Sequence, residues 1–226
     1  MILTGTLVNA ILIVMGGIVG CLVGHKIPEK MKTIVMQASA LAVVYIGISG
    51  AMQGKNTLVC ILSLVIGAVI GEIIDIDKGM NNVGTVLETK FFSNSKSFAK
   101  GFVSATVLFC TGAMAIVGSI ESGINLNHDI LISKGLIDGT IAIIMASTLS
   151  VGVIFSGLSV LAYQGILTIC ASQIGSLLTD TVVTEMSCVG SIIIMAIGLN
   201  MLEITNIKIA NLIPAAFLPI LLCMFL

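Results

Sequence analysis

The chain has 226 residues, of which 57% are hydrophobic and 9% are charged, and its formal net charge is −1. So few polar side chains cannot cover the surface of a soluble domain of this size, which excludes a soluble fold and indicates an integral membrane protein. The ten basic residues are scattered and form no basic stripe, which excludes a nucleic-acid-binding surface.

The first apolar run, residues 3–24, is predicted to be a membrane-spanning helix that remains in the protein. It starts at the N-terminus without a basic segment and ends without a small-residue cleavage site, unlike a signal peptide. Gly16, Gly20 and Gly24 recur every four residues, a spacing that lets another helix backbone approach closely. Asn9 adds a polar group that requires a partner once it is removed from water.

Seven further apolar segments follow, and crossing the hydrocarbon core takes about 20 residues. The eight predicted helices cover residues 3–24, 33–52, 57–74, 101–120, 134–154, 158–178, 188–202 and 209–226. The sequence therefore predicts an all-α polytopic transmembrane bundle that forms one domain, residues 1–226. Residues 75–100 form the one long polar connection, in which Val83, Val86, Leu87 and Phe91 have the spacing of a short amphipathic helix on the membrane surface.

The lysines predict the orientation of the bundle, because basic residues are retained on the cytoplasmic side. If the N-terminus lies outside, the loops after the first, third and seventh helices are cytoplasmic and contain all the lysines except Lys55 and Lys134. We therefore expect a multi-pass protein with its N-terminus outside and a cytoplasmic 75–100 loop.

Helices 1–3 align with helices 6–8 when the chain is shifted by about 150 residues, which would give a repeat of inverted topology. Gly24 then meets Gly175, the pair Ile46-Gly47 meets Ile197-Gly198, and Asn56 lies opposite Asn206 after an adjustment of one residue. Chance matches are the alternative explanation, because apolar spans are built from few residue types. Both explanations stay open here.

Small residues dominate the stretch from Cys110 to Ser119 in the fourth predicted helix. Thr111, Ala115 and Ser119 share one helix face, and Gly112 and Gly118 flank it. Such a stretch is either a tight packing seam or a place where hydroxyls and backbone are available to a ligand. Its predicted position, level with Asp138 in the central helices, slightly favours the ligand, with packing against the fifth helix as the alternative.

Polar side chains inside the predicted spans are the other candidates for a binding site. Asp138 is expected about one turn inside the fifth helix, where it would attract a cation at the outer mouth or, alternatively, cap the start of the helix. Tyr163 and Gln164 form an adjacent polar pair in the sixth helix, although hydrogen bonds between helices would also explain them. The candidate solute-binding residues are Asn9, Thr111, Gly112, Ser119, Asp138, Thr148, Tyr163, Gln164 and Asn200.

The sequence offers no catalytic or metal-binding pattern. The six cysteines lie in or beside apolar segments without a C-x-x-C pair, and the two histidines fall in loops on opposite predicted faces. We therefore expect no enzyme activity, no cofactor and no metal.

The expected function is a transporter or channel for a small solute or ion. The absence of arginine, and of any lysine within a predicted span, argues against a strongly anionic solute. The alternative is a membrane scaffold held together by glycine-rich packing. Expected partners are the solute, the lipid bilayer and, through the glycine seams, a second copy of the chain; nucleic acid is not expected.

Four motifs in order, together with the glycine zipper that follows the first of them, give the chain a resemblance to a known family. They are G-T-L-V-N-A at residues 5–10, T-G-A-M-A-I-V-G-S at 111–119, F-S-G-L-S-V-L-A-Y-Q-G at 155–165 and N-L-I-P-A at 211–215. Together they resemble the YdfK/YqgA-like bacterial membrane proteins, a family of unknown function. The resemblance implies a polytopic protein of the bacterial cytoplasmic membrane and assigns no substrate and no residue roles.

Overall fold

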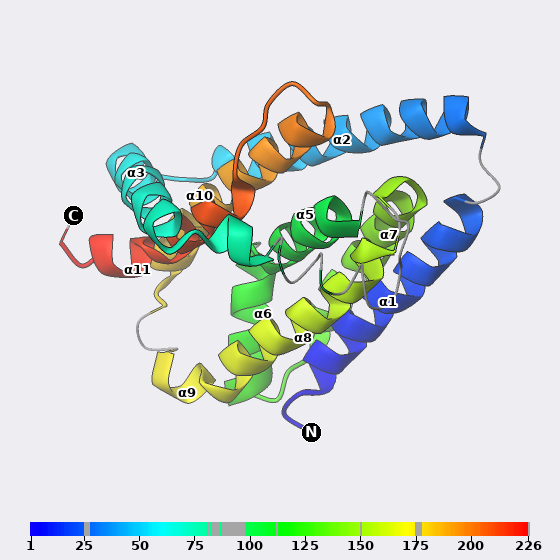
Figure 1. The fold of residues 1–226 in the computed structure, drawn as a ribbon. Coiled ribbons are helices and arrows are strands. Elements are labelled where there is room, and N and C mark those ends of the chain that lie inside the picture. The colour runs from blue at the N-terminus through cyan, green and yellow to red at the C-terminus, as the bar shows by residue number, and fades with distance from the viewer. Residues whose placement is uncertain are drawn as a thin grey trace.

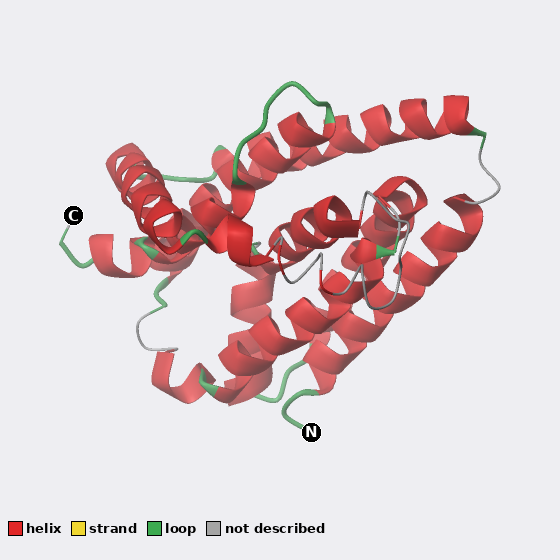
Figure 2. Cartoon of the chain, viewed as in Figure 1, coloured by secondary structure: helices red, strands yellow, loops and turns green. Residues whose placement is uncertain are grey.

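The computed structural model describes residues 1–24, 28–80, 82, 86, 98–111, 113–149, 151–174 and 178–225. Every regular element within these ranges is a helix, which confirms the predicted all-α class (Figure 2). Of the predicted amphipathic helix in the 75–100 loop, Val83, Leu87 and Phe91 lie outside the described residues.

In the part of the chain that the structure describes, six helices are long and apolar enough to cross a membrane. They are α1 (Thr4–Gly24), α2 (Glu29–Ala51), α3 (Thr57–Ile74), α7 (Asp129–Leu149), α8 (Gly152–Ile169) and α10 (Asp180–Met201). The pair α5 (Phe98–Cys110) and α6 (Ala113–Ile124) is together apolar enough for a seventh span, but its axes meet at an angle of 60°, which is the geometry of a broken span or of a re-entrant loop. The fourth predicted helix is therefore broken inside the small-residue stretch.

The eighth predicted span, residues 209–226, is not one long helix. It consists of a 3-10 helix, η2 (Ile209–Phe217), and the short α11 (Pro219–Leu222), and a four-residue helix, α9 (Ala171–Ile174), follows α8. Pro214 lies inside η2 and Pro219 begins α11. Proline lacks the N–H of a regular helix and clashes with the preceding turn, which explains the interruption. The described residues thus contain six or seven long spans where the sequence predicted eight.

Two helix starts also differ from the prediction. Helix α7 begins at Asp129 instead of residue 134, and α10 begins at Asp180 instead of residue 188. At the start of α10 the Thr179 hydroxyl accepts a hydrogen bond from the Val182 N–H, and at the start of α7 the Asn127 side chain accepts one from the Asp129 N–H. Such polar residues lower the hydropathy of a first turn without preventing it from being helical.

The helices α1, α7 and α8 form one closely packed group (Figure 1). The glycine zipper of α1 lies against the backbone of α7. A Cβ at Gly16 would lie 2.1 Å from the Gly139 carbonyl oxygen, and a Cβ at Gly20 would lie 2.3 Å from the Ile143 carbonyl oxygen. Along both helices the contacts follow in the same order, so α1 and α7 are parallel. Helix α8 runs antiparallel to α1, with Gly157 against Val14.

A second group contains α2, α10, α3 and η2. Helix α10 runs antiparallel to α2, as shown by the contacts of Gly47 with Met195 and of Gly54 with Cys188. Helix α3 packs against η2 through Gly67. In Figure 1, α5 lies between this group and the group of α1, α7 and α8. The fold therefore consists of two packed groups with the broken helix pair α5 and α6 connecting them.

Candidate functional site

Asp138 lies in the middle of α7 and not near its outer end. The helix starts at Asp129 and has 21 residues, so Asp138 lies about 14 Å along its axis at about 1.5 Å per residue. The predicted position one turn inside the helix is therefore wrong, because the polar first turns were assigned to a loop. For the same reason Lys134 also lies within the span, which corrects the expectation that no lysine does.

Lys134 and Asp138 form a buried ion pair. Their spacing of four residues places them on one face of α7, and the distance from Lys134 Nζ to Asp138 Oδ2 is 2.5 Å. The two side chains are only 7% and 6% exposed. Replacing a buried ion pair by apolar side chains is often neutral or stabilising, so stability alone does not explain this pair. Ionisable groups at such depth in membrane proteins mark solute or ion pathways.

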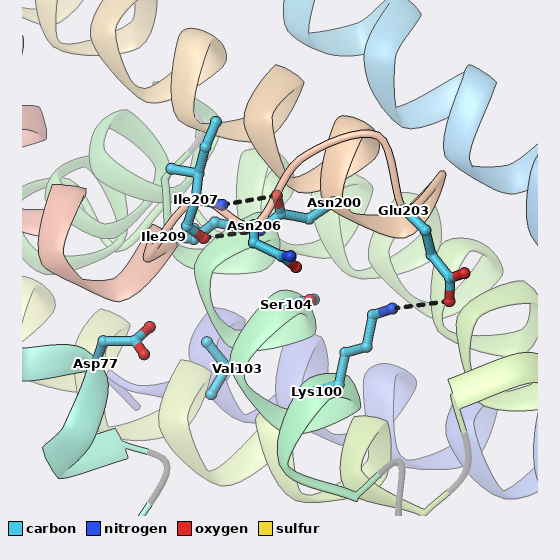
Figure 3. Close-up of a pocket in the computed structure, with 9 residues that line it drawn as sticks. All are labelled: Asp77, Lys100, Val103, Ser104, Asn200, Glu203, Asn206, Ile207 and Ile209. Carbon is cyan, nitrogen blue, oxygen red and sulfur yellow. Dashed lines mark hydrogen bonds and ion pairs between the residues drawn. The ribbon is translucent and has the colours of Figure 1, made fainter.

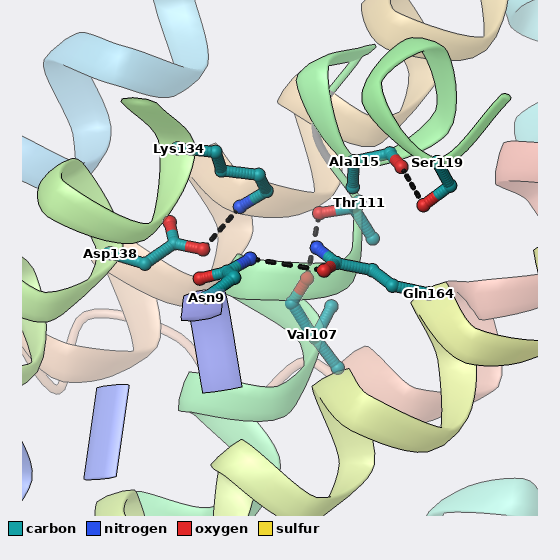
Figure 4. A network of polar contacts seen from close by, with 8 residues as sticks. All are labelled: Asn9, Val107, Thr111, Ala115, Ser119, Lys134, Asp138 and Gln164. Carbon is teal, nitrogen blue, oxygen red and sulfur yellow. Dashed lines mark hydrogen bonds and ion pairs between the residues drawn. The ribbon is translucent and has the colours of Figure 1, made fainter. Parts of the chain in front are cut away.

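Two amides from neighbouring helices extend this pair into a cluster (Figure 4). Asn9 of α1 donates a hydrogen bond from Nδ2 to Gln164 Oε1 of α8 over 3.1 Å, and its side chain also interacts with the Asp138 carboxylate. Gly135 permits this approach, because a Cβ there would lie 2.9 Å from the Asn9 Cα. We call Asn9, Lys134, Asp138 and Gln164 the polar cluster; it connects α1, α7 and α8.

The polar cluster contains two atoms without a hydrogen-bond partner among the described residues. These are Asn9 Oδ1, an acceptor, and Gln164 Nε2, a donor, and both side chains are fully buried. A buried polar group left unpaired costs about 1–3 kcal/mol. One acceptor and one donor are therefore available to a polar ligand or to water.

Two cavities lie near the polar cluster; Lys134 and Asp138 line the first, and Tyr163, next to Gln164 in the chain, lines the second. A cleft of about 500 Å³ opens between α2, α7 and α10; it reaches Lys134 and Asp138, and we call it the wide cleft. A smaller, mostly apolar cavity of about 180 Å³ is lined by Thr111 and Cys110 at the end of α5 and by Tyr163 of α8. Leu108 of α5 and Met114 of α6 also line the wide cleft. The break between α5 and α6 thus borders the same region as the ion pair.

Hydroxyl groups predicted to face a ligand are bonded within their own helices. Thr111 Oγ1 donates to the Val107 carbonyl over 2.8 Å, Ser119 Oγ to Ala115 over 2.6 Å (both drawn in Figure 4), and Thr148 Oγ1 to Met145 over 3.1 Å. Ser119 is fully buried, and nearby Gly118 contacts Leu131 of α7, as the packing alternative expects. Thr111 still lines the small cavity, while Gly112 lies outside the described residues.

Asn200 lies apart from the polar cluster, at the C-terminal end of α10 (Figure 3). Its Oδ1 accepts hydrogen bonds from the Thr205 hydroxyl and the Ile207 N–H, and its Nδ2 donates to the Ile207 carbonyl. It lines an open pocket of about 480 Å³ where Lys100 Nζ lies 3.9 Å from Glu203 Oε1. Asn200 therefore organises the loop after α10, and the structure does not bring it together with Asn9 or Gln164.

Comparison with known proteins places the chain in a family. Residues 4–224 match the family described as "Protein of unknown function (DUF554)". The chain belongs to the DUF554 family. It is 31% identical over 219 residues to the uncharacterized membrane protein YdfK of Bacillus subtilis (strain 168), and 30% identical over 219 residues to the uncharacterized protein YqgA of Escherichia coli (strain K12). Each alignment covers 95% of this chain and 93% of the relative. No solved structure matches.

The family assignment confirms the resemblance and the membrane character expected from the sequence of this DUF554 protein. Two buried charged residues were nevertheless missed as candidates. Lys134 was counted as an outer-loop lysine, although its spacing of four residues from Asp138 could have placed both on one helix face. Glu185 was assigned to a loop, but it lies in α10 and is fully buried.

Glu185 joins α10 of this DUF554 protein to the turn between α2 and α3. Its Oε1 accepts hydrogen bonds from the backbone N–H groups of Lys55, at 2.7 Å, and Asn56, at 2.9 Å. The Asn56 side chain in turn accepts from the Leu58 and Val59 N–H groups and caps α3. The carboxylate thereby holds the start of α3 against α10.

We expect Glu185→Ala to destabilise the protein by about 1.5–3 kcal/mol, the range for a hydrogen bond to a charged group. Glu185→Gln, which retains an oxygen acceptor, is expected to cost less. Thermal unfolding in detergent measures both, with the exposed Glu203 as the control position for Glu203→Ala. Equal losses for Glu185→Ala and Glu203→Ala would contradict this role of Glu185.

Proposed function

We propose that this DUF554 protein is a transporter or channel that moves a small solute or ion across the bacterial cytoplasmic membrane. One observation carries the proposal: the Lys134–Asp138 pair lies in the middle of α7, is almost fully buried, and still forms part of the wall of the wide cleft. Charged side chains at this depth are costly, and in membrane proteins they face pathways and cavities.

The broken helix pair supports the same function. Many transporters bind their solutes where a membrane helix is interrupted, because the free ends of the two half-helices expose backbone groups there. Here α5 ends at Cys110 and α6 starts at Ala113, and the two axes differ by 60°. Thr111, between them, lines the small cavity beside the polar cluster.

We further infer an inverted repeat from the way the helices pair. The counterparts in the shifted alignment are α1 with α8, α2 with α10, and α3 with η2, and each of these pairs packs antiparallel. A two-fold axis in the membrane plane would produce this arrangement. Movement of the α2–α10 group against the α1–α7–α8 group would then open and close the wide cleft. In this arrangement we place the N-terminus outside.

A scaffold is the second candidate, and the close glycine contacts favour it. These contacts are made within one chain, since Gly16 and Gly20 of α1 face α7 and Gly67 of α3 faces η2. A homodimer would therefore have to use other surfaces than these seams. The cavity between α5 and α8 argues against a uniformly close-packed interior, so we favour transport and assign no enzymatic activity.

Flux measurements on the purified protein in proteoliposomes test the proposal. With a panel of ions and small metabolites, Asp138→Asn and Gln164→Ala are each expected to reduce the initial rate by about tenfold or more, since a hydrogen bond to a charged group contributes about 1.5–3 kcal/mol and 1.4 kcal/mol corresponds to a factor of ten.

Two matched controls change the same chemical groups at exposed positions. Asp129→Asn lies on the first turn of α7 and Gln37→Ala on α2, and neither should alter flux. If no solute moves, or if the cluster variants transport as fast as the controls, the proposed site is wrong.

A further inference from the structure

On the basis of the proposed transport function, we propose that the solute is a small zwitterion, such as a free amino acid, bound in the wide cleft by Lys134 and Asp138. The charge balance of the site is the first observation. An ammonium and a carboxylate 2.5 Å apart and nearly fully buried neutralise each other.

A solute with a net charge would disturb this balance, because it would leave one buried charge uncompensated at a cost of several kcal/mol per ion. A zwitterion leaves the charge balance of the site unchanged. Its carboxylate can bind Lys134 while its ammonium binds Asp138, so that every charge keeps a partner of opposite sign. No proton has to be transferred and no covalent bond changes.

The unpaired amide atoms are the second, independent observation. Asn9 Oδ1 is a free acceptor, which suits an ammonium N–H, and Gln164 Nε2 is a free donor, which suits a carboxylate oxygen. Figure 4 shows the Asp138 carboxylate, the Asn9 amide and the Gln164 amide in one row. Neither amide lines the wide cleft itself, so Lys134 and Asp138 are the groups of the polar cluster that the cleft reaches, and the two unpaired amide atoms lie behind them.

The lining of the wide cleft suits the rest of such a solute. Its volume of about 500 Å³ lies within the usual range for small-molecule sites, about 300–1,000 Å³. Opposite the ion pair, Ser49, Gln53 and Ser191 add hydrogen-bonding groups, and Ile46 and Ile194 add apolar surface. The charged groups therefore lie on α7, and α2 and α10 are left to contact the side chain of the solute.

The test compares matched solutes with the wild-type protein in proteoliposomes. Each free L-amino acid of a panel is compared with its amide, which retains only the positive charge, and with its N-acetyl derivative, which retains only the negative charge. We expect at least one free amino acid to be transported and to stabilise the protein thermally, with half-saturation at least tenfold lower than for either blocked form. Equal use of a blocked form overturns the zwitterion assignment.

Charge variants sharpen the test, because substitutions in an ion pair with a structural role only would not change the selectivity among the three solute forms. Asp138→Asn is expected to shift preference toward the N-acetyl derivative, and Lys134→Gln toward the amide, whereas Asp129→Asn should leave the order unchanged. A parallel loss for all three solute forms in both cluster variants contradicts the assignment. Flux of inorganic ions or uncharged solutes without amino acid flux overturns only the zwitterion assignment. Absence of flux for every solute overturns the proposed transport function as well.

Discussion

Asp138→Asn alone is expected to destabilise the protein by about 3–5 kcal/mol, because it leaves the Lys134 ammonium buried without a counter-charge. Lys134→Met combined with Asp138→Leu removes both charges and should recover most of that loss, since apolar side chains of similar volume often replace a buried ion pair without cost. Thermal unfolding of the purified variants in detergent measures both effects.

The same pair of variants separates stability from function. The double variant should fold well and still lack solute flux, because the groups that bind the solute are gone. Asp129→Asn, at an exposed position on the same helix, controls for the loss of one carboxylate. If the double variant were as unstable as Asp138→Asn, or if it transported normally, the ion pair would have a structural role only.

Gly16→Ala is expected to have a comparably large effect, although it adds only one methyl group. The new Cβ would lie 2.1 Å from the carbonyl oxygen of Gly139, and neither backbone can yield without separating α1 from α7. Overpacking typically costs about 1–3 kcal/mol, and a clash between two backbones should reach or exceed the upper end. The measured quantities are thermal stability and the yield of monodisperse protein.

Gly165→Ala is the matched control for this substitution. It also lies inside a helix of the same group, but a Cβ there would meet nothing within 4 Å. Alanine favours a helix over glycine by up to about 1 kcal/mol, so this variant should be neutral or slightly stabilised. Similar losses at both positions would contradict the backbone contact between α1 and α7.

The sequence was sufficient for those properties that depend on hydropathy and local spacing. Apolar segments predicted six of the long helices, because the hydrocarbon core requires a minimum length of apolar chain. The four-residue spacing of Gly16, Gly20 and Gly24 predicted close packing, and the contacts of α1 with α7 confirm it. Asn9, Asp138 and Gln164 could be named as candidates because polar side chains are rare in such segments.

Tertiary contacts decided how those residues are grouped and at what depth they lie. The first turns of α7, from Asp129 to Lys134, are polar and were assigned to a loop, but they belong to a helix that packs along α1, and both Lys134 and Asp138 are buried there. The partner of Asn9 is more than 150 residues away in the chain, and local periodicity carries no information about such a distance. The same limit applies to Asn200, which looked like an intramembrane group and instead organises a loop.

By itself, then, the sequence determined that this chain is a helical membrane protein of the DUF554 family, because hydropathy and motif order are properties of the chain alone. Only the tertiary structure decided that the small-residue stretch contains the break between α5 and α6, and that Lys134 and Asp138 form one buried pair beside Asn9 and Gln164. The physical reason is that a buried charge is tolerated only where other helices supply partners and exclude lipid, and those helices come from distant parts of the chain.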